Sequence, residues 1–331
     1  MTAKVVSFIN LKGGVGKSTL AMIAAEYLCF RFHKRVLAID MDSQANLTYA
    51  MLPEDRIQQL NREGRTVYHL FRGSLQGMIS LLDVVARPPL IASNISRGLI
   101  RSTSASLDMV ISLPDLAQLD EEMLAMWERG DPAPKDFRWV LKKGLDPVLV
   151  DYDVVIIDCP PGLSVLTSNA LVASDYYVCP VIPEPLSILG VELVSDRVRG
   201  LTQREKGIDI RFAGCVLNKV MYYRRSHAFE APRLYSAQLG SLPIISRDRY
   251  RAFYWWIPDN ERVRKLGEYE NDDLDVGPFK FGTIYNKYKT GSALRNNPTS
   301  YQSRHAEEGS TYTLSQRLER VIQELAERIK L

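Results

Sequence analysis

A short apolar run near the N-terminus leads directly into a glycine-rich loop, and this junction restricts the possible folds more than any other feature of the chain. The run is Lys4 to Ile9 (KVVSFI), the loop is 10–19 (NLKGGVGKST), and residues 18–32 have the character of a helix. Glycines let the backbone bend so that successive N–H groups point at phosphate oxygens, and the helix that follows adds its dipole. The order therefore predicts a phosphate-binding site. Its residues are Lys12, Gly13, Gly14, Val15, Gly16, Lys17, Ser18 and Thr19.

Two residues of this loop carry the expected chemistry. Lys17 would neutralise the β- and γ-phosphates of a nucleotide, and the Ser18 hydroxyl would bind Mg²⁺. The loop departs from the common pattern, because Leu11 stands where that pattern has a glycine and Lys12 is an additional lysine. The alternative, a glycine turn without a ligand, fits poorly with a strand on one side and a helix on the other.

Two acidic motifs follow at the ends of later apolar runs. Residues 38–48 (AIDMDSQANLT) place Asp40 and Asp42 after one run, and residues 154–162 (VVIIDCPPG) place Asp158 after another. An Asp at a strand end beside a phosphate loop can hold Mg²⁺ through its water shell, since Mg²⁺ keeps several waters. The alternatives are that Asp40 and Asp42 cap a helix and that Asp158 only caps its strand end.

Together these motifs resemble the ParA/MinD superfamily of ATPases, and within it the short, Soj-like ParA proteins. KGGVGKST resembles the family's deviant Walker A loop, and residues 40–48 resemble its D-x-D-P-Q-x-N-x-T motif, with Ser43 in place of proline. Residues 167–171 (TSNAL) resemble its T-x-N-A-L motif. The likeness runs from residue 4 to about 245 and fades beyond Ser246.

The resemblance implies an Mg²⁺-dependent ATPase that forms a homodimer in its ATP state. By resemblance, Lys12 reaches the phosphates bound by the partner subunit, much as an arginine finger does. Asp42 orients the attacking water, and Asp40 supports the lysine and metal network. Asp158 holds Mg²⁺ through water, and the loop that follows it is expected to sense the γ-phosphate.

Apolar runs alternate with helix-like stretches along most of the chain. The strand-like runs are 4–9, 35–39, 107–111, 154–157, 177–181 and 212–217. Some are apolar on both faces, as the strands of a covered parallel sheet are. The pattern predicts an α/β fold with a doubly wound, mostly parallel sheet and helices on both faces.

Residues 1–245 are expected to form the P-loop ATPase core, and residues 246–331 a divergent C-terminal part of the same domain. This part contains a Tyr-, Asn- and Gly-rich insertion at about 266–310 and a helix at about 314–331. One stripe of the helix is apolar, comprising Leu314, Leu318, Val321, Ile322, Leu325 and Ile329. Because its polar side mixes both charges and it lacks Trp and Phe, packing against protein is favoured over membrane insertion.

Charge is unevenly distributed, although the whole chain is close to neutral at +3. Residues 193–265 carry 15 Lys and Arg against 7 Asp and Glu, whereas residues 1–192 carry 18 against 22. Phosphate neutralisation supplies most of the affinity in non-specific DNA binding, so this basic stretch is a candidate DNA-binding surface. Its candidate contacts are Arg197, Arg199, Arg204, Arg224, Arg225, Arg247, Arg249 and Arg251. The alternative is that these arginines belong to solvated helix faces.

Asn218 follows the run 212–217 and, with Lys219, invites comparison with the guanine motif N-K-x-D. Met221 stands where that motif has its Asp, so ATP is favoured over a guanine nucleotide. By resemblance Asn218 contacts adenine, and a role in a turn is the alternative.

The resemblance also gives expectations about partners. ParA-type ATPases bind DNA non-specifically as ATP dimers, and a ParB-like centromere-binding adaptor stimulates hydrolysis, so plasmid or chromosome partition is the predicted role. Alternatives are a MinD-like membrane-associated ATPase and a ParA-like module of another cargo, conjugation or defence system. The chain's four cysteines include no C-x-x-C pair, which argues against a redox or metal-delivery ATPase.

No apolar run is long enough to span a membrane, and the N-terminal residues do not resemble a signal peptide. The chain is therefore expected in the cytoplasm, associated with the nucleoid and not with a membrane.

Overall fold

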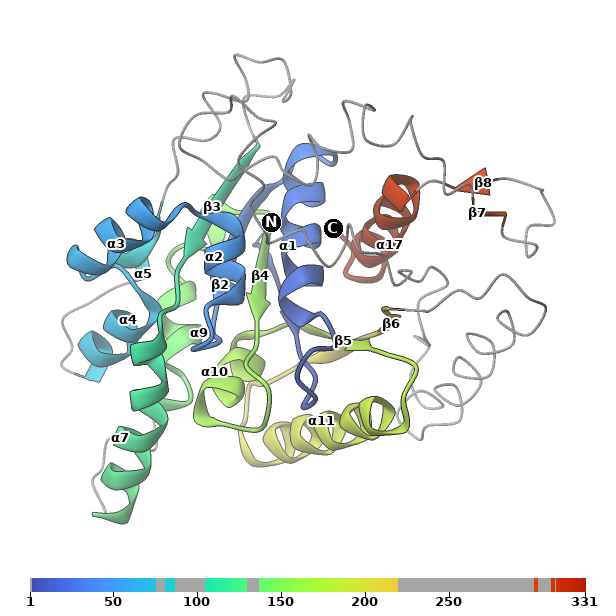
Figure 1. Ribbon diagram of the computed structural model, residues 1–331. Helices are drawn as coiled ribbons and strands as arrows, with labels where there is room; N and C mark the ends of the chain where they lie inside the picture. The colour runs from blue at the N-terminus through green and yellow to red at the C-terminus, as the bar shows by residue number, and fades with distance from the viewer. Residues whose placement is uncertain are drawn as a thin grey trace.

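The computed structural model describes residues 2–75, 81–86, 105–129, 137–219, 301–302, 311–312 and 314–331 (Figure 1). A six-stranded sheet lies at its centre, in the order β3-β2-β4-β1-β5-β6. The strands are β1 (Lys4–Phe8), β2 (Arg35–Asp40), β3 (Ser106–Val110), β4 (Val154–Asp158), β5 (Tyr176–Val181) and β6 (Arg211–Leu217). All their pairings are parallel, so their carboxyl ends meet at one edge, where ligands bind in such sheets. The six predicted strands and the doubly wound α/β fold are confirmed.

Helices lie between these strands along the chain and after the last of them. They are α1 (Lys17–Phe30), α2 (Asn46–Met51), α3 (Glu54–Arg62), α4 (Val67–Leu75), α5 (Leu81–Val84), η1 (Pro114–Leu116), α7 (Ala117–Glu128), α9 (Val140–Leu145), η2 (Leu149–Asp151), α10 (Val165–Ala173), α11 (Pro185–Arg204) and α17 (Leu314–Arg328). A separate two-residue antiparallel ladder joins β7 (Tyr301–Gln302) to β8 (Thr311–Tyr312).

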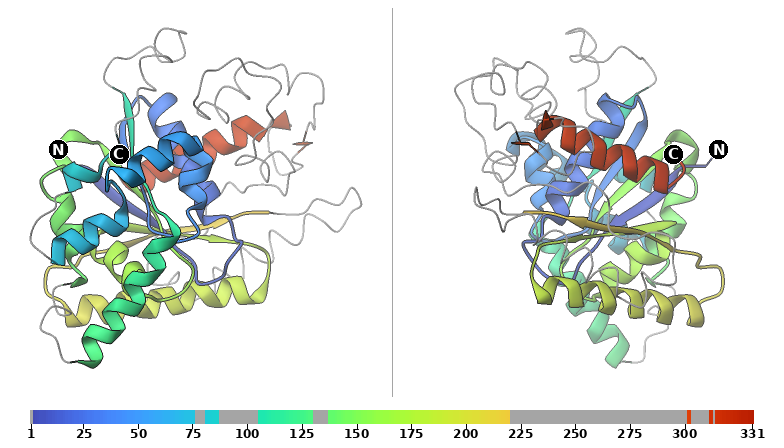
Figure 2. Two further views of the ribbon diagram at one scale, coloured as in Figure 1. Left: turned by 60° about the vertical axis from the view of Figure 1, so that its left-hand side comes forward. Right: turned by 90° about the vertical axis from the view of Figure 1, so that its right-hand side faces the viewer.

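Alternate residues of each strand point to opposite faces of the sheet and fill two apolar cores. In β4, Val155 and Ile157 belong to the core that contains α10 and α11, whereas Val154 and Ile156 belong to the core that contains α1 and α17. Figure 2 shows α11 and α17 on opposite sides of the sheet. Because both faces are covered, the strands are largely apolar runs in the sequence.

The last helix, α17, packs against the domain. Four of its apolar residues are each at most 1% exposed, namely Leu318, Val321, Ile322 and Leu325. Ile329, directly after the helix, is fully buried as well. Arg328 donates to the carbonyl of Ala213 in β6 at 2.8 Å, and Arg31, directly after α1, pairs with Glu319 at 3.0 Å. From Leu318 to Ile329 the apolar stripe therefore faces protein, as the sequence predicted.

The predicted boundary near residue 245 and nearly all of the predicted insertion lie outside the described residues, so the division of the chain stays a prediction. Among the helices that the structure does describe, none is long and apolar enough to cross a membrane. The four cysteines are buried and carry free thiols, as expected from their apolar surroundings.

Candidate nucleotide-binding site

The glycine loop joins the end of β1 to the start of α1. Gly14 and Gly16 adopt left-handed conformations, with φ angles of 73° and 91°, which residues with a Cβ disfavour. Helix α1 begins at Lys17 without a side-chain cap. The N–H groups of its first turn are therefore directed toward this end of the sheet, where an anion would complete their hydrogen bonds.

Lys17 turns its ammonium toward the interior. The residue is 6% exposed, and its Nζ donates to the carbonyl of Lys12 at 3.3 Å. Burial lowers the pKa of Lys17, whereas the carboxylates of Asp158 and Asp42 raise it. A partly desolvated ammonium beside the loop is placed to pair with the oxygens of a polyphosphate.

Asp40 and Asp158 end the adjacent strands β2 and β4 and lie side by side in register. Both are fully buried. Burial, and then the charge of Asp40, raise the pKa of Asp158 well above its usual range, while Ser18 and Lys17 oppose the shift. Ser18 lies near enough to act on this pKa, but neither carboxylate oxygen of Asp158 meets hydrogen-bond geometry with a described residue.

A buried carboxylate without a partner calls for a cation or a donor. Asp158 and the Ser18 hydroxyl fit the few oxygen ligands that a protein gives to Mg²⁺, which keeps most of its water. In the described part of the chain no three His, Cys, Asp or Glu side chains gather as a metal cluster. Asp158 and Ser18 suit an ion that takes its other ligands from water and phosphate.

Asp40, in contrast, has its hydrogen bonds filled. One oxygen accepts from the backbone N–H and the hydroxyl of Thr48, both at 2.8 Å, and the other accepts from the N–H of Asp42 at 3.1 Å. Burial raises the pKa of Asp40 to about 7, although the Thr48 bonds lower it. Asp40 therefore holds the turn into α2 through Thr48 and fixes the backbone of Asp42. Asp42 itself is 5% exposed and accepts from the N–H of Gln44 at 2.9 Å.

Asn218 and Lys219, after β6, hold the other side of the loop. Asn218 is 2% exposed, and its Nδ2 donates to the carbonyl of Val15 at 2.9 Å. Lys219 has a left-handed backbone with φ of 51°, and its Nζ donates to the carbonyl of Gly14 at 2.7 Å. Asn218 thus supports the loop through the carbonyl of Val15, and its contact with adenine stays a prediction. The contact of Lys219 was not predicted, since the sequence offers no sign that it folds back.

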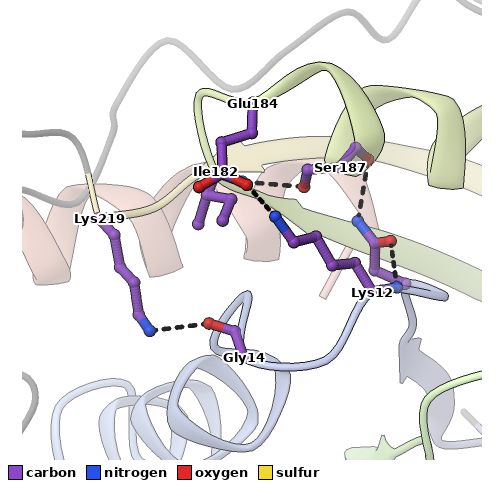
Figure 3. Close-up of polar contacts among 7 residues, drawn as sticks. Lys12, Gly14, Ile182, Glu184, Ser187 and Lys219 are labelled. Atoms are coloured by element: carbon purple, nitrogen blue, oxygen red, sulfur yellow. Dashed lines mark hydrogen bonds and ion pairs between the residues drawn. The ribbon is translucent and has the colours of Figure 1, made fainter.

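Lys12 lies at the surface beside the start of α11 and forms an ion pair with Glu184 (Figure 3). Asn10, buried at the end of β1, accepts from the N–H of Lys12 at 3.1 Å. Neither Glu184 nor Asn10 was among the predicted site residues. A conventional sequence motif names the glycines and lysines of the loop and gives no signal for the residues that hold it.

The segment after β4 links the site to α11 through hydroxyl groups. Ser164 caps α10 by accepting from the N–H of Thr167 at 3.2 Å, and the Thr167 hydroxyl donates to the carbonyl of Gly162 at 3.0 Å. The Ser168 hydroxyl donates to the carbonyl of Ser164 at 2.9 Å and accepts from Arg197 at 2.8 Å. These bonds connect the loop after Asp158 to Arg197, so a movement of the loop would shift the Arg197 side chain.

Only three of the predicted DNA-binding arginines lie among the residues that the structure describes. Arg197 is half-buried against Ser168, and burial, followed by Arg138 and Arg204, lowers its pKa. Arg199 pairs with Asp196 at 3.1 Å on the exposed side of α11, and Arg204 is exposed at its last turn. The remaining predicted contacts, Arg224, Arg225, Arg247, Arg249 and Arg251, lie outside the described residues. The DNA-binding surface stays a prediction.

Comparison with known proteins agrees with these motifs. Residues 3–210 match the AAA_31 family, described as an AAA domain. The chain is 31% identical over 215 residues to the sporulation initiation inhibitor protein Soj of Bacillus subtilis, covering 65% of this chain and 72% of Soj. It is 32% identical over 187 residues to the chromosome-partitioning ATPase Soj of Thermus thermophilus, covering 56% of this chain and 57% of that protein.

A solved structure of an ATP complex of Cyanothece McdA(D38A) superposes with a TM-score of 0.63 at 15% identity, covering 100% of this chain and 97% of McdA. That likeness shows a shared fold. The sequence matches carry the assignment further, because the family match spans more than half of the chain and includes the glycine loop and both acidic motifs. The chain therefore belongs to the AAA_31 family, of the ParA/MinD type, together with the Soj proteins.

Proposed function

We propose that this chain is an Mg²⁺-dependent ATPase of the ParA type. In this proposal it dimerises with ATP bound, binds DNA non-specifically, and releases it when a partner protein stimulates hydrolysis, so that DNA is partitioned or a cargo is positioned. The observation that carries the nucleotide part is the buried, unpartnered carboxylate of Asp158 beside Lys17 at the glycine loop. The chromosome-partitioning ATPase of Thermus thermophilus supports the partition role.

Each residue has a distinct task in this proposal. The backbone N–H groups of residues 13–19 and the ammonium of Lys17 bind the phosphates of ATP. Ser18 and Asp158 would hold Mg²⁺, the latter through water, and the ion supplies positive charge to the β- and γ-phosphates. Asn218 keeps the loop in the shape that presents these N–H groups.

Hydrolysis needs a positioned water and compensation of negative charge. Asp42 accepts a hydrogen bond from the attacking water and directs its oxygen at the γ-phosphorus. The bond from that phosphorus to the bridging oxygen breaks, ADP leaves with the electron pair, and the water's protons end on inorganic phosphate and solvent. Lys12 of the partner subunit would stabilise the transferred phosphoryl group, and Asp40 keeps the backbone of Asp42 in place.

The MinD-like alternative has less support. A membrane-binding helix needs a free apolar face, whereas the face of α17 is buried against α1 and the sheet. The proposal accordingly places the chain in the cytoplasm on the nucleoid, with a ParB-like or other centromere-binding adaptor as partner. A ParA-like module serving another cargo shares every motif and is distinguished only by its adaptor.

Sedimentation with and without ATP tests the switch. We expect an ATP-dependent dimer that Lys12→Ala abolishes and that Asp42→Ala prolongs, because hydrolysis then no longer dissolves it. Lys206→Ala, an exposed lysine beyond α11, is the matched control and should leave the dimer unchanged. A dimer that forms equally without ATP would contradict the proposal.

DNA binding is tested with the same protein. Affinity for DNA of arbitrary sequence should require ATP and fall steeply with salt, since released counterions drive it. Flotation with liposomes in the absence of DNA binding would support the membrane alternative instead.

A further inference from the structure

An ion pair joins the glycine loop to the residue that precedes α11. Lys12 Nζ and the Glu184 carboxylate form it, and Figure 3 shows the two side chains directed at each other. Their side chains are 28% and 54% exposed, so both reach the surface. Glu184 stands immediately before α11, yet its carboxylate makes no cap on the helix. It is directed to Lys12 instead.

A buried amide fixes the backbones that carry this pair. Asn10 Oδ1 accepts from the N–H of Lys12 at 3.1 Å, and Asn10 Nδ2 donates to the carbonyl of Ser187 in α11 at 3.3 Å. Gly190 allows this approach, because a Cβ there would lie 2.3 Å from Asn10 Oδ1. The loop and the first turn of α11 are thus joined directly, and Glu184 is held where Lys12 can reach it.

We propose that Glu184 is a positioning residue that holds Lys12 within its own chain when no nucleotide is bound. The inference rests on the proposed function, in which Lys12 acts on phosphates bound by the partner subunit. One ammonium cannot keep full contact with the Glu184 carboxylate and also cross to the partner's phosphates. Formation of the ATP dimer therefore exchanges a carboxylate partner for phosphate oxygens, and the pair restrains the dimer until nucleotide is present on both chains.

The size of the effect follows from the exposure of the pair. Exposed ion pairs are weak, and breaking one changes an equilibrium by roughly twofold to fivefold. A dimer breaks two such pairs, one in each chain, so the dissociation constant is raised about 4- to 25-fold relative to a chain without the pair. A restraint of this size delays assembly without preventing it, because phosphates attract an ammonium more strongly than one carboxylate does.

The test compares the full chain with its Glu184→Gln variant, which keeps the shape and removes the charge. Sedimentation over a range of protein concentrations, with a saturating non-hydrolysable ATP analogue, measures the dissociation constant of the dimer. We expect it to fall about 4- to 25-fold in the variant. The difference should shrink at high salt, which screens the pair. An unchanged or raised constant overturns the proposal.

Two further variants separate this inference from the proposed function. Glu192→Gln changes a charge on the same helix away from Lys12 and should leave the constant unaltered. Because Lys12→Ala alone should already abolish the dimer, the double variant Lys12→Ala/Glu184→Gln should form none either, and a dimer restored there would show that Glu184 acts other than through Lys12. If the unaltered chain forms no ATP-dependent dimer, the proposed function itself fails. If it dimerises and Glu184→Gln changes nothing, only the restraint is wrong.

A measurement on the nucleotide-free chain does not depend on dimerisation. Acetylation of Lys12 by a small amine-reactive reagent, followed by mass spectrometry, reports how accessible its ammonium is. Lys12 should react several-fold faster in Glu184→Gln than in the unaltered chain, while Lys206 reacts equally in both. Equal acetylation rates of Lys12 in the two chains would show that Glu184 does not hold its ammonium.

Discussion

The side-chain amide of Asn218 occupies the space that a side chain on Gly16 would need. Its Nδ2 lies 2.1 Å from the position of a Cβ on Gly16 and donates to the carbonyl of the preceding residue, Val15, at 2.9 Å. The end of β6 is therefore fitted against the glycine loop, and the backbone of Gly16, at φ 91°, is held in a shape that only glycine adopts readily.

Replacement of Gly16 by alanine should disrupt this fit in two ways. The Cβ would collide with Asn218, and the left-handed backbone of residue 16 would be strained by about 1–2 kcal/mol for any residue other than glycine. We expect Gly16→Ala to lower the free energy of unfolding by about 2–4 kcal/mol and to abolish nucleotide binding. Denaturant unfolding and titration with a fluorescent ATP analogue measure the two effects.

The double variant Gly16→Ala/Asn218→Ala separates the two causes. Removal of the amide relieves the collision but not the backbone strain, so the double variant should be more stable than the sum of the single changes indicates. Strict additivity would show that Asn218 and Gly16 are not coupled.

Lys219 should contribute to nucleotide affinity through the loop. Its Nζ donates to the carbonyl of Gly14, and an exposed hydrogen bond of this kind is worth about 0.5–1.5 kcal/mol. Lys219→Ala is therefore expected to weaken the binding of both ATP and ADP by about 2- to 10-fold. The rate of hydrolysis at saturating ATP should change little. Calorimetric titration provides the measurement, and Lys206→Ala is the control. Loss of the rate alone, with normal affinity, would contradict this role.

The sequence predicted the sheet well because each strand is a short, largely apolar run, and β1, β2 and β4 end at recognisable motifs. It also predicted Lys17 and Asp158 at one site, since the carboxyl ends of parallel strands meet at one edge. It could not predict the supports of the loop. Asn10, Glu184 and Lys219 contact it from positions far apart in the sequence, and no periodicity or motif records which side chain will fold back onto a carbonyl or an ammonium.

Asp158 should destabilise the protein in the absence of ligand. Its carboxylate is fully buried, adjoins Asp40, and lacks a hydrogen-bond partner among the described residues. We expect Asp158→Asn to raise the free energy of unfolding of the nucleotide-free chain by about 0.5–2 kcal/mol and to abolish hydrolysis. Addition of Mg²⁺ and ATP should stabilise the unaltered chain more than the variant. A variant less stable than the unaltered chain would contradict this account.

The stability gained in Asp158→Asn should depend on pH. The pKa of Asp158 is raised in the folded state, so between its usual value near 4 and the raised value the folded state binds more protons than the unfolded chain. The penalty from this carboxyl is thus absent at low pH and grows as pH rises through that window. The difference between variant and unaltered chain, measured by urea unfolding from pH 4 upward, should increase with pH. A difference that is constant or falls would show that the folded-state pKa is not raised.

The C-terminal helix offers a test of packing against membrane binding. Ile322 is fully buried in the core shared with α1, whereas Arg320 is exposed and bonds only to Gln323 among the described contacts, at 3.1 Å. Ile322→Ala should lower the free energy of unfolding by about 2–4 kcal/mol, because it leaves a cavity, and Arg320→Ala should change it by no more than about 0.5 kcal/mol. If α17 served instead as a membrane anchor, Ile322→Ala would leave the stability of the soluble chain intact and reduce its flotation with liposomes. Denaturant unfolding and flotation of the same two variants distinguish these roles, since a packed helix changes only the first measurement and an anchor only the second.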